Sequence, residues 1–297
     1  MRICFSIILL LISCRAENGR FVTNVTFPYN LNKPAEKYVV PGYLTEISGI
    51  AFYKETILCI QDEIGTVYRF DPSKKTVVEK YTFGEKGDYE DISVKGNTVY
   101  VLRSNGDITK IGNTESVARS VTILETPLSA KNNAEGLSFD SSGKNLLIAC
   151  KGSPSVREEK KKENARSVFS FDPESRNFNY SAVFTIDLKQ RDNYKEPGIY
   201  DYLQVLKRKG LTHESSFQPS GIAVDPVTGE IFVISATGKL ILILNSEGKI
   251  TDLGYLDPEI FPQPEGICFS PSGDLYISNE GRGGYGTILR FMPVPKK

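Results

Sequence analysis

The chain has 297 residues, with no tryptophan and a single histidine, His213. Catalysis that depends on imidazole, and zinc sites that need several histidines, therefore have almost no residues to use. The 36 basic residues equal the 36 acidic ones, so the formal net charge is zero. This balance excludes a global positive field that would attract nucleic acid, and no nucleic-acid partner is predicted.

The apolar run at the start of the chain is too short to cross a membrane. It extends from Ile3 to Ile12 after the basic Arg2, which is typical of the apolar region of a signal peptide. The run ends in Leu-Ile-Ser-Cys at Cys14, which resembles a bacterial lipobox. We therefore predict a signal peptide over residues 1–14, lipidation of Cys14 and a tether over residues 15–30. Acyl chains would anchor the protein to a membrane of the bacterial cell envelope without a spanning helix. An ordinary signal peptide with an incidental cysteine is the alternative.

The cysteines left after removal of that segment are Cys59, Cys150 and Cys268. Their number is odd, and no Cys-x-x-Cys spacing occurs, so neither a disulfide framework nor a zinc site is indicated. Each lies in an apolar, strand-like run. We predict that all three are small buried hydrophobic residues.

Five short strings in the chain resemble one another, and each begins a series of predicted strands. They are Glu46-Ile-Ser-Gly-Ile, Tyr89-Glu-Asp-Ile, Ala134-Glu-Gly-Leu, Pro219-Ser-Gly-Ile and Pro264-Glu-Gly-Ile. A tight turn, a second strand, a glycine turn and a third strand follow each string, and most units add a fourth, more polar strand. Short strands at regular spacing with turn signals indicate an all-β repeat fold.

The spacing of the strings sets the number of repeats. The aligned glycine or aspartate falls at positions 49, 91, 136, 221 and 266, and the interval from 136 to 221 is about twice the others. That interval holds either a sixth blade or one blade with insertions. Two stretches favour insertions: residues 153–166 contain a charge run, and residues 189–217 predict a short amphipathic helix and no strand. We predict a five-bladed β-propeller that forms a single domain over residues 31–297, with six blades as the alternative.

The two ends of the repeat region complement each other. The last unit has three predicted strands, and a further strand pattern, Glu36–Pro41, precedes the first unit. Pairing of these segments would close the ring and hide two sheet edges.

The first strand of each propeller blade lines the central channel, so equivalent positions form a ring at one depth. This ring would contain Glu90, Glu135 and Glu265, with Ser48 and Ser220 in the other two blades. Carboxylates that lie close together raise one another's pKa unless a cation compensates them. Because the ring offers oxygen ligands only, it favours Ca²⁺ over Zn²⁺. The alternative is that these glutamates cap turns or accept backbone N–H groups.

A second layer of candidates lies near this ring. Glu46 and Asp62 complete the predicted metal ligands, and Ser48, Ser220, Glu280 and Arg282 are weaker candidates for ligand contacts. Nucleophilic catalysis finds little support, because no Gly-x-Ser-x-Gly string occurs and His213 has no evident partner. Acid–base chemistry by carboxylates with a metal stays open.

An ordered set of strings carries a family resemblance: TEISGIAF, QDEIGTVYRFD, GDYEDI, NAEGLSFD, QPSGIAVDPVTGEIFVIS and FPQPEGICFSPSGDLYISNEG. Across most of residues 40–292 the chain resembles the SdiA-regulated (YjiK-like) family of bacterial envelope proteins. The resemblance implies a five-bladed propeller, related to NHL-type repeats and distantly to calcium-dependent phytase-like propellers, with an associated calcium site. Glu90, Glu135 and Glu265 match that site best. Asp91 departs from the glycine of the other repeats, and its carboxylate would either crowd the ring or add a ligand.

These observations predict a lipid-anchored, calcium-binding propeller of the cell envelope that binds a small ligand or an envelope protein without turnover. The alternative is a calcium-dependent hydrolase, either a phytase-like phosphoesterase or a lactonase. Such an enzyme would need cations beside the acidic ring, and the candidates are Arg103, Lys151 and Arg282.

Overall fold

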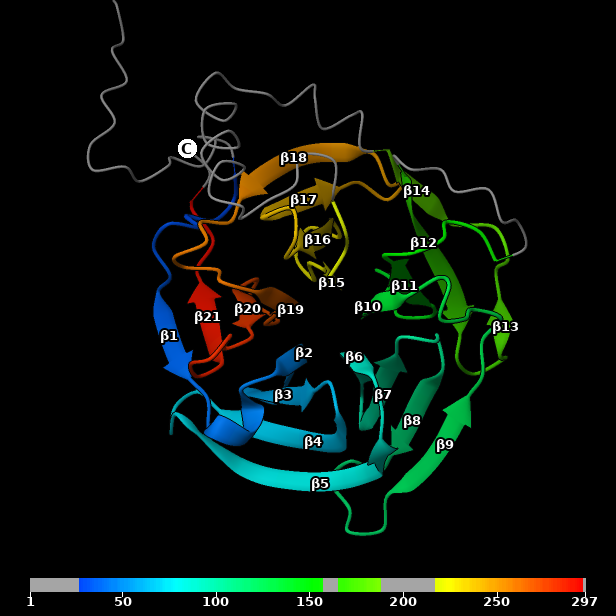
Figure 1. Cartoon of the computed structure of the whole chain (residues 1–297), viewed down its shortest axis with the longest axis horizontal. Coiled ribbons are helices and arrows are strands. Elements are labelled where there is room, and N and C mark those ends of the chain that lie inside the picture. Colours follow the sequence, from blue (N-terminus) through cyan, green and yellow to red (C-terminus); the bar gives the residue numbers. More distant parts are fainter. Residues whose placement is uncertain (1–26, 157–164, 188–216, 296–297) are drawn as a thin grey trace, which may run out of the picture.

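The computed structural model describes residues 27–156, 165–187 and 217–295. They form five antiparallel sheets around a central axis (Figure 1). The predicted five-bladed β-propeller is confirmed. The helix predicted within residues 189–217 and the charge run noted within residues 153–166 lie outside the described residues.

Each blade runs from an inner strand at the axis to an outer strand at the rim. Blade 1 contains β2 (Ile47–Tyr53), β3 (Thr56–Gln61), β4 (Ile64–Asp71) and β5 (Thr76–Lys86). Blade 2 contains β6 (Tyr89–Lys95), β7 (Thr98–Arg103), β8 (Ile108–Gly112) and β9 (Ser120–Leu124). Blade 3 contains β10 (Ala134–Phe139), β11 (Leu146–Cys150), β12 (Ala165–Asp172), β13 (Asn177–Phe178) and β14 (Phe184–Asp187).

The last two blades follow the same order. Blade 4 contains β15 (Gly221–Val224), β16 (Ile231–Ser235), β17 (Leu240–Leu244) and β18 (Ile250–Tyr255). Blade 5 contains β19 (Pro264–Phe269), β20 (Leu275–Asn279), β21 (Thr287–Phe291) and, as its outer strand, β1 (Glu36–Val39). A single 3₁₀ turn, η1 (Gly42–Leu44), leads from β1 into blade 1.

Strand β1 closes the ring, as predicted. It pairs antiparallel with β21, with Glu36 opposite Arg290 and Val39 opposite Thr287, and the two strands lie side by side in Figure 1. Blade 5 therefore has four strands, three from the C-terminal end of the chain and one from the N-terminal end, and this pairing closes the ring.

The propeller begins earlier than predicted. Phe27 and Tyr29 are buried in the core between blades 4 and 5, and the Tyr29 hydroxyl donates a hydrogen bond to Gly273 O over 2.7 Å. Residues 27–30, which were assigned to the tether, therefore belong to the domain. Their aromatic rings fill space against Phe232 and Phe269 that the blades alone leave open.

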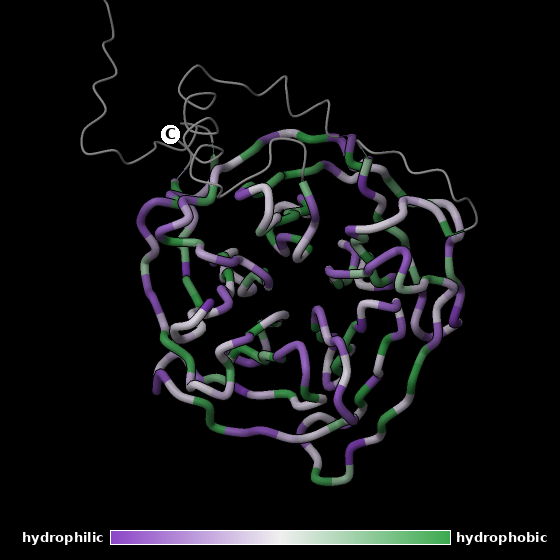
Figure 2. Tube along the Cα trace, viewed as in Figure 1, coloured by the Kyte–Doolittle hydropathy of each residue, from purple (hydrophilic) through white to green (hydrophobic). Residues whose placement is uncertain are grey.

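The core consists of five clusters of buried residues packed mainly between neighbouring blades. Apolar positions accordingly occur in all five blades and not on one side of the molecule (Figure 2). Cys59, Cys150 and Cys268 are buried free thiols, as predicted. Stability therefore comes from apolar burial between sheets.

The inner strands contact one another at the aligned position of the repeat. A Cβ atom at Gly49 would lie 2.5 Å from Asp91 Cα, and one at Gly221 would lie 2.6 Å from Glu265 O. Gly136 and Gly266 meet the next blade in the same way. Glycine is required at these four positions because the neighbouring backbone occupies the space of a side chain.

Asp91 occupies this position in blade 2 and joins it to blade 3. Its Oδ2 accepts a hydrogen bond from Leu137 N over 2.7 Å, and its Oδ1 accepts one from Ile92 N over 2.8 Å. The residue is 1 % exposed, and burial raises the pKa of its carboxyl well above the usual range. The departure from glycine therefore supplies a bridge between inner strands.

Replacement of this bridge should destabilise the ring. Asp91→Ala leaves the Leu137 and Ile92 amides buried without their acceptors, so we expect a loss of about 2–4 kcal/mol in the free energy of unfolding. Asp91→Asn keeps one acceptor oxygen and should lose less. Urea unfolding measures both variants, and an unchanged midpoint for Asp91→Ala would contradict the bridging role.

Candidate functional site

The predicted site residues gather at one mouth of the central channel. Each inner strand begins at this mouth, and each antiparallel second strand ends there, as the pairing of Ala134 with Cys150 and of Pro264 with Asn279 shows. We define the acidic mouth by the carboxylates that these strand ends carry: Glu46, Asp62, Glu90, Glu135, Glu265 and Glu280. The repeat thus brings together residues that are far apart in the sequence.

Lys151 lies among the three glutamates of the predicted ring. Its Nζ is 3.1 Å from Glu135 Oε1, and Asn133 Nδ2 donates a hydrogen bond of 2.7 Å to the same oxygen. Burial lowers the pKa of Lys151, but Glu135, Glu265 and Glu90 raise it by more, so the net shift is upward. One lysine is therefore shared by three carboxyl groups.

The glutamates of the ring hold their protons strongly. Burial, and then Glu135 and Asp88, raise the pKa of Glu90 to about 9. Burial is also the main cause that raises the pKa of Glu265 to about 8, with Glu135 adding to it. The pKa of Glu135 is raised by burial despite the opposing effect of Lys151. Glu90 and Glu265 are therefore mainly neutral at pH 7, because their negative charge is not compensated.

A second acidic group lies at blades 1 and 5. Burial and then Glu46 raise the pKa of Asp62. Burial raises the pKa of Glu280 against the effect of Arg282, and Asp62 and Glu46 raise it further. Gln263 connects this group, since its amide donates to Glu280 and its Oε1 accepts from Arg282 Nε. The predicted residues Glu46, Asp62, Glu280 and Arg282 thus form one electrostatic neighbourhood.

Two buried acceptor oxygens at this mouth lack a donor. Within the part of the chain that the structure describes, Asp62 Oδ1 and Asn279 Oδ1 have no hydrogen-bond partner. Asn279 is 1 % exposed and is the last residue of β20, directly before Glu280. A buried acceptor without a donor is costly unless a cation or water satisfies it.

The oxygen atoms at this mouth are ligands of the kind that a hard cation prefers, but they are not arranged around a common cation position. All the candidate ligands are oxygens, as Ca²⁺ prefers. Among the described residues, however, no three His, Cys, Asp or Glu side chains form a group that could hold a metal ion. Lys151 holds the Glu135 carboxylate. A cation at the ring would therefore have to displace Lys151 and draw the other carboxylates inward.

The two serines of the ring serve the contacts between blades. Ser48 Oγ donates to Tyr89 O over 3.0 Å, which joins blade 1 to blade 2. Ser220 Oγ donates to Pro264 O over 2.7 Å, which joins blade 4 to blade 5. Their predicted contact with a ligand stays a prediction, and the glutamates carry the charge of the ring.

Sequence reasoning missed Lys239, a buried cation beside the mouth. It is 4 % exposed and donates to Phe261 O over 3.1 Å and to Pro262 O over 2.6 Å. Burial and then Arg282 lower its pKa to about 8, against the effect of Glu265. The residue lies in an ordinary turn between β16 and β17, so no local signal marks it. Arg103, also proposed as a cation at the mouth, lies over the Tyr89 ring at 5.6 Å.

Comparison with known proteins supports the fold. No protein-family model and no curated protein matches the chain. Among solved structures, a glutaminyl cyclase from Myxococcus xanthus aligns with a TM-score of 0.54 at 11% identity, covering 89% of this chain and 97% of that one. A PQQ-bound aldose sugar dehydrogenase from Streptomyces coelicolor aligns with a TM-score of 0.50 at 13% identity, covering 88% and 98%. At these identities the similarity concerns the propeller architecture.

The raised glutamate pKa values predict a pH-dependent stability. In the unfolded chain these glutamates have the ordinary pKa of 4.5, whereas in the folded protein the pKa is about 9 for Glu90 and about 8 for Glu265. At pH values between the unfolded and folded pKa, the folded state therefore keeps protons that the unfolded chain has lost. The free energy of unfolding of the metal-free protein should therefore fall from about pH 5 to about pH 8. Above that range the lowered pKa of Lys239 acts in the opposite direction.

Thermal melts in chelator across this range test the expectation. Glu90→Gln should flatten the pH dependence, because the glutamine has no proton to lose. Glu247→Gln, on the exposed turn after β17, serves as the matched control and should keep the wild-type slope. Equal slopes for Glu90→Gln and the wild type would show that Glu90 does not titrate as described.

Proposed function

We propose that this propeller is a calcium-dependent binding module whose ligand site is the acidic mouth. The observation that carries the proposal is the cluster of Glu90, Glu135 and Glu265 around Lys151, where burial and mutual repulsion keep Glu90 and Glu265 protonated at pH 7. A bound divalent cation would displace the protons of Glu90 and Glu265, and its positive charge would stabilise the two carboxylates that result.

The ring glutamates would supply the main ligands of the ion. Glu46 and Asp62 complete the set on the side of blade 1, where Asp62 Oδ1 lacks a donor. When bound, Ca²⁺ would supply positive charge for an anionic group of a ligand, such as a carboxylate or a phosphate. Arg282 and Lys239, which lie near Glu265 and Glu280, would orient that group.

Lys151 acts in this proposal as the internal competitor of the ion. Its ammonium group holds Glu135 while the site is free of cation, and it is released when the ion binds. Release places a mobile cation at the mouth, where it can contact the ligand. Binding of calcium and binding of the ligand would thus be coupled through one side chain.

Calcium titration tests the ion site. At a free Ca²⁺ concentration about 100 times Kd, the free energy of unfolding should rise by about 2.7 kcal/mol. Calorimetry in buffers of different ionisation enthalpy should show that protons are released at pH 7, because Glu90 and Glu265 ionise on binding. Lys151→Met should bind Ca²⁺ more tightly by about tenfold, since no ammonium competes for Glu135.

Matched variants make this test specific. Glu135→Gln and Glu265→Gln should weaken binding strongly, and Glu247→Gln should bind as the wild type does. An unchanged melting temperature in chelator and in excess Ca²⁺, together with no bound metal on elemental analysis, would overturn the ion site. Weaker binding by Lys151→Met would overturn the role of Lys151 as competitor.

A calcium-dependent hydrolase is the second candidate function. It is favoured by the cations Lys151, Lys239 and Arg282, which lie near enough to the glutamates to shift or share their pKa effects and could hold a phosphate group. The same protein is assayed on phytate, p-nitrophenyl phosphate and a lactone, with and without Ca²⁺. Calcium-dependent turnover that is lost in Glu135→Gln would replace the binding module with an enzyme, either a phosphoesterase or a lactonase.

The proposed location is a membrane of the bacterial cell envelope, through a lipid on Cys14. Cys14 and the preceding apolar run lie outside the described residues, and among the residues described no helix is long and apolar enough to span a membrane. The support is the lipobox-like string that ends the apolar run. An acyl anchor would hold the propeller at the membrane surface.

Lipidation is tested by expression in a bacterial host with labelled palmitate. The wild type should carry the label and sediment with membranes, and Cys14→Ser should lose both properties. Cys4→Ser, which lies within the apolar run, is the control and should behave as the wild type. Label or membrane association that persists in Cys14→Ser would overturn the anchor.

A further inference from the structure

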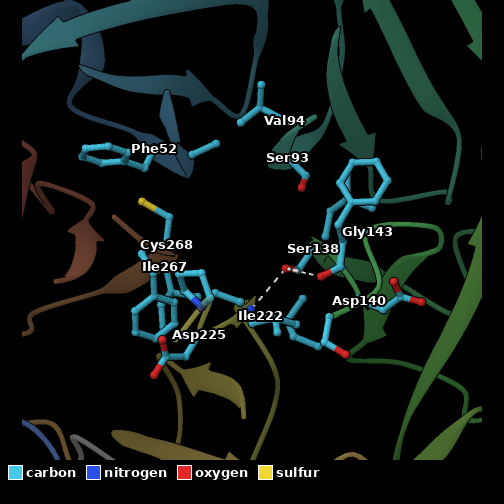
Figure 3. A pocket seen from close by; sticks show the side chains of 18 of the residues that line it. Phe52, Ser93, Val94, Ser138, Asp140, Gly143, Ile222, Asp225, Ile267 and Cys268 are labelled. Carbon is cyan, nitrogen blue, oxygen red and sulfur yellow. Dashed lines mark hydrogen bonds between the residues drawn. The ribbon is translucent and has the colours of Figure 1, made fainter. Parts of the chain in front are cut away.

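Every blade of the propeller has two sheet edges, one at the axis and one at the rim. The inner edges surround the central channel, where residues of all five inner strands line one shared space of about 440 Å³, Ser93, Ile222 and Cys268 among them (Figure 3). A space of this size holds a small molecule and not a strand of another folded chain. Only the outer edges are therefore open to pairing with another protein.

The outer strands of four blades carry charged residues, which protect a sheet edge against pairing with another chain. These residues are Glu79 and Lys80 in β5, Asp187 in β14, Asp252 in β18, and Glu36 and Lys37 in β1. The other outer strand of blade 3, β13, is only two residues long. The segment that precedes β1 also covers part of β18, since a Cβ atom at Gly254 would lie 2.8 Å from Leu31 and 3.1 Å from Phe27.

Strand β9, the outer strand of blade 2, lacks this protection. Its sequence is Ser-Val-Thr-Ile-Leu, without a charged residue, proline or glycine. Its first four residues are exposed, Val121 by 47 % and Ile123 by 59 %. It lies at the rim in Figure 1, and within the described residues no strand pairs with its outer edge. An uncharged, exposed edge strand rich in β-branched residues is a template for pairing with another strand.

The sequence of β9 is complementary to itself when two copies run antiparallel. With Thr122 opposite its own equivalent, Val121 lies opposite Ile123, and all five residues of the strand are paired. Because side chains alternate between the two faces, this register keeps Val121 and Ile123 of both copies on one face of the joint sheet. Apolar cross-strand pairs of this kind stabilise an antiparallel ladder.

Opposite charges flank the strand in the same register. Arg119 directly precedes β9 and lies opposite the exposed Glu125, which directly follows it. The Arg119 guanidinium also pairs with Glu79 and lies over the Tyr81 ring at 3.8 Å, which fixes its charge at this end of the strand. The register therefore places no like charges directly opposite each other and combines opposite signs at both ends.

We propose that the protein forms a two-fold symmetric dimer through antiparallel pairing of β9 with β9 of a second copy. The axis passes through Thr122, and the two blades form one continuous sheet with four strands from each copy. The interface lies on the rim, whereas the acidic mouth lies at the axis. Dimer formation is therefore independent of calcium binding.

Charge variants at the two-fold axis test the dimer by sedimentation equilibrium. The full-length chain carries Cys4→Ser and Cys14→Ser, so that neither a lipid nor an N-terminal thiol contributes, and it should be a dimer in Ca²⁺ and in chelator. Thr122→Lys and Thr122→Glu should each weaken dimerisation by about tenfold, because like charges then lie opposite each other. An equal mixture of the two variants should restore the dimer. Thr251→Lys, on the outer strand β18, is the matched control and should stay dimeric.

A disulfide tests the register. Residues opposite each other in an antiparallel pair have Cα atoms about 4.5–5.5 Å apart, which a disulfide can span. In the same background, Thr122→Cys should form a disulfide with its own equivalent on mild oxidation. Thr251→Cys should not, and Cys59, Cys150 and Cys268 are buried. A monomeric parent chain, or a dimer that persists in both Thr122→Lys and Thr122→Glu, would overturn the interface. A dimer that forms no disulfide in Thr122→Cys would overturn the register.

Discussion

The contact between neighbouring inner strands at one repeated position governs the rest of the structure. Four blades have a glycine at this position, so that the backbones of neighbouring strands are in contact. Blade 2 has Asp91 instead, which accepts a hydrogen bond from the next blade. This contact draws the residues that precede it, the ring glutamates among them, into one electrostatic neighbourhood. A side chain at any of the glycines would force the blades apart at the axis.

The fold was largely predictable because its signals are local. Alternating apolar residues, turn glycines and a regular spacing specify each blade without knowledge of the others, and the unpaired last unit predicted the closure by β1. The exception is the segment with Phe27 and Tyr29. Its burial depends on Phe232 and on the carbonyl of Gly273 in two distant blades, and no period in its own sequence records them.

The site was predictable in position but not in its interactions. Repeat symmetry places equivalent residues at equal depth, and this is why three glutamates from different blades were expected to meet. Symmetry does not say where a side chain points or what it contacts. The Lys151–Glu135 pair, the buried Lys239 and the bridging Asp91 all depend on contacts between blades that break the symmetry. The deviations from the repeat are thus the part that sequence alone could not resolve.

The choice of residue at the ring separates stability from binding. A serine there donates a hydrogen bond to the next blade, as Ser48 and Ser220 do, and so stabilises the ring. A glutamate there is desolvated, and its raised pKa is a loss of stability at neutral pH. The stability of the free protein therefore gives no reason for glutamate in three blades. Cation binding does give one, because the burial that penalises an uncompensated carboxylate also strengthens its attraction to a cation. Burial of the glutamates, which destabilises the ring without a cation, would thus also strengthen its binding of the ion.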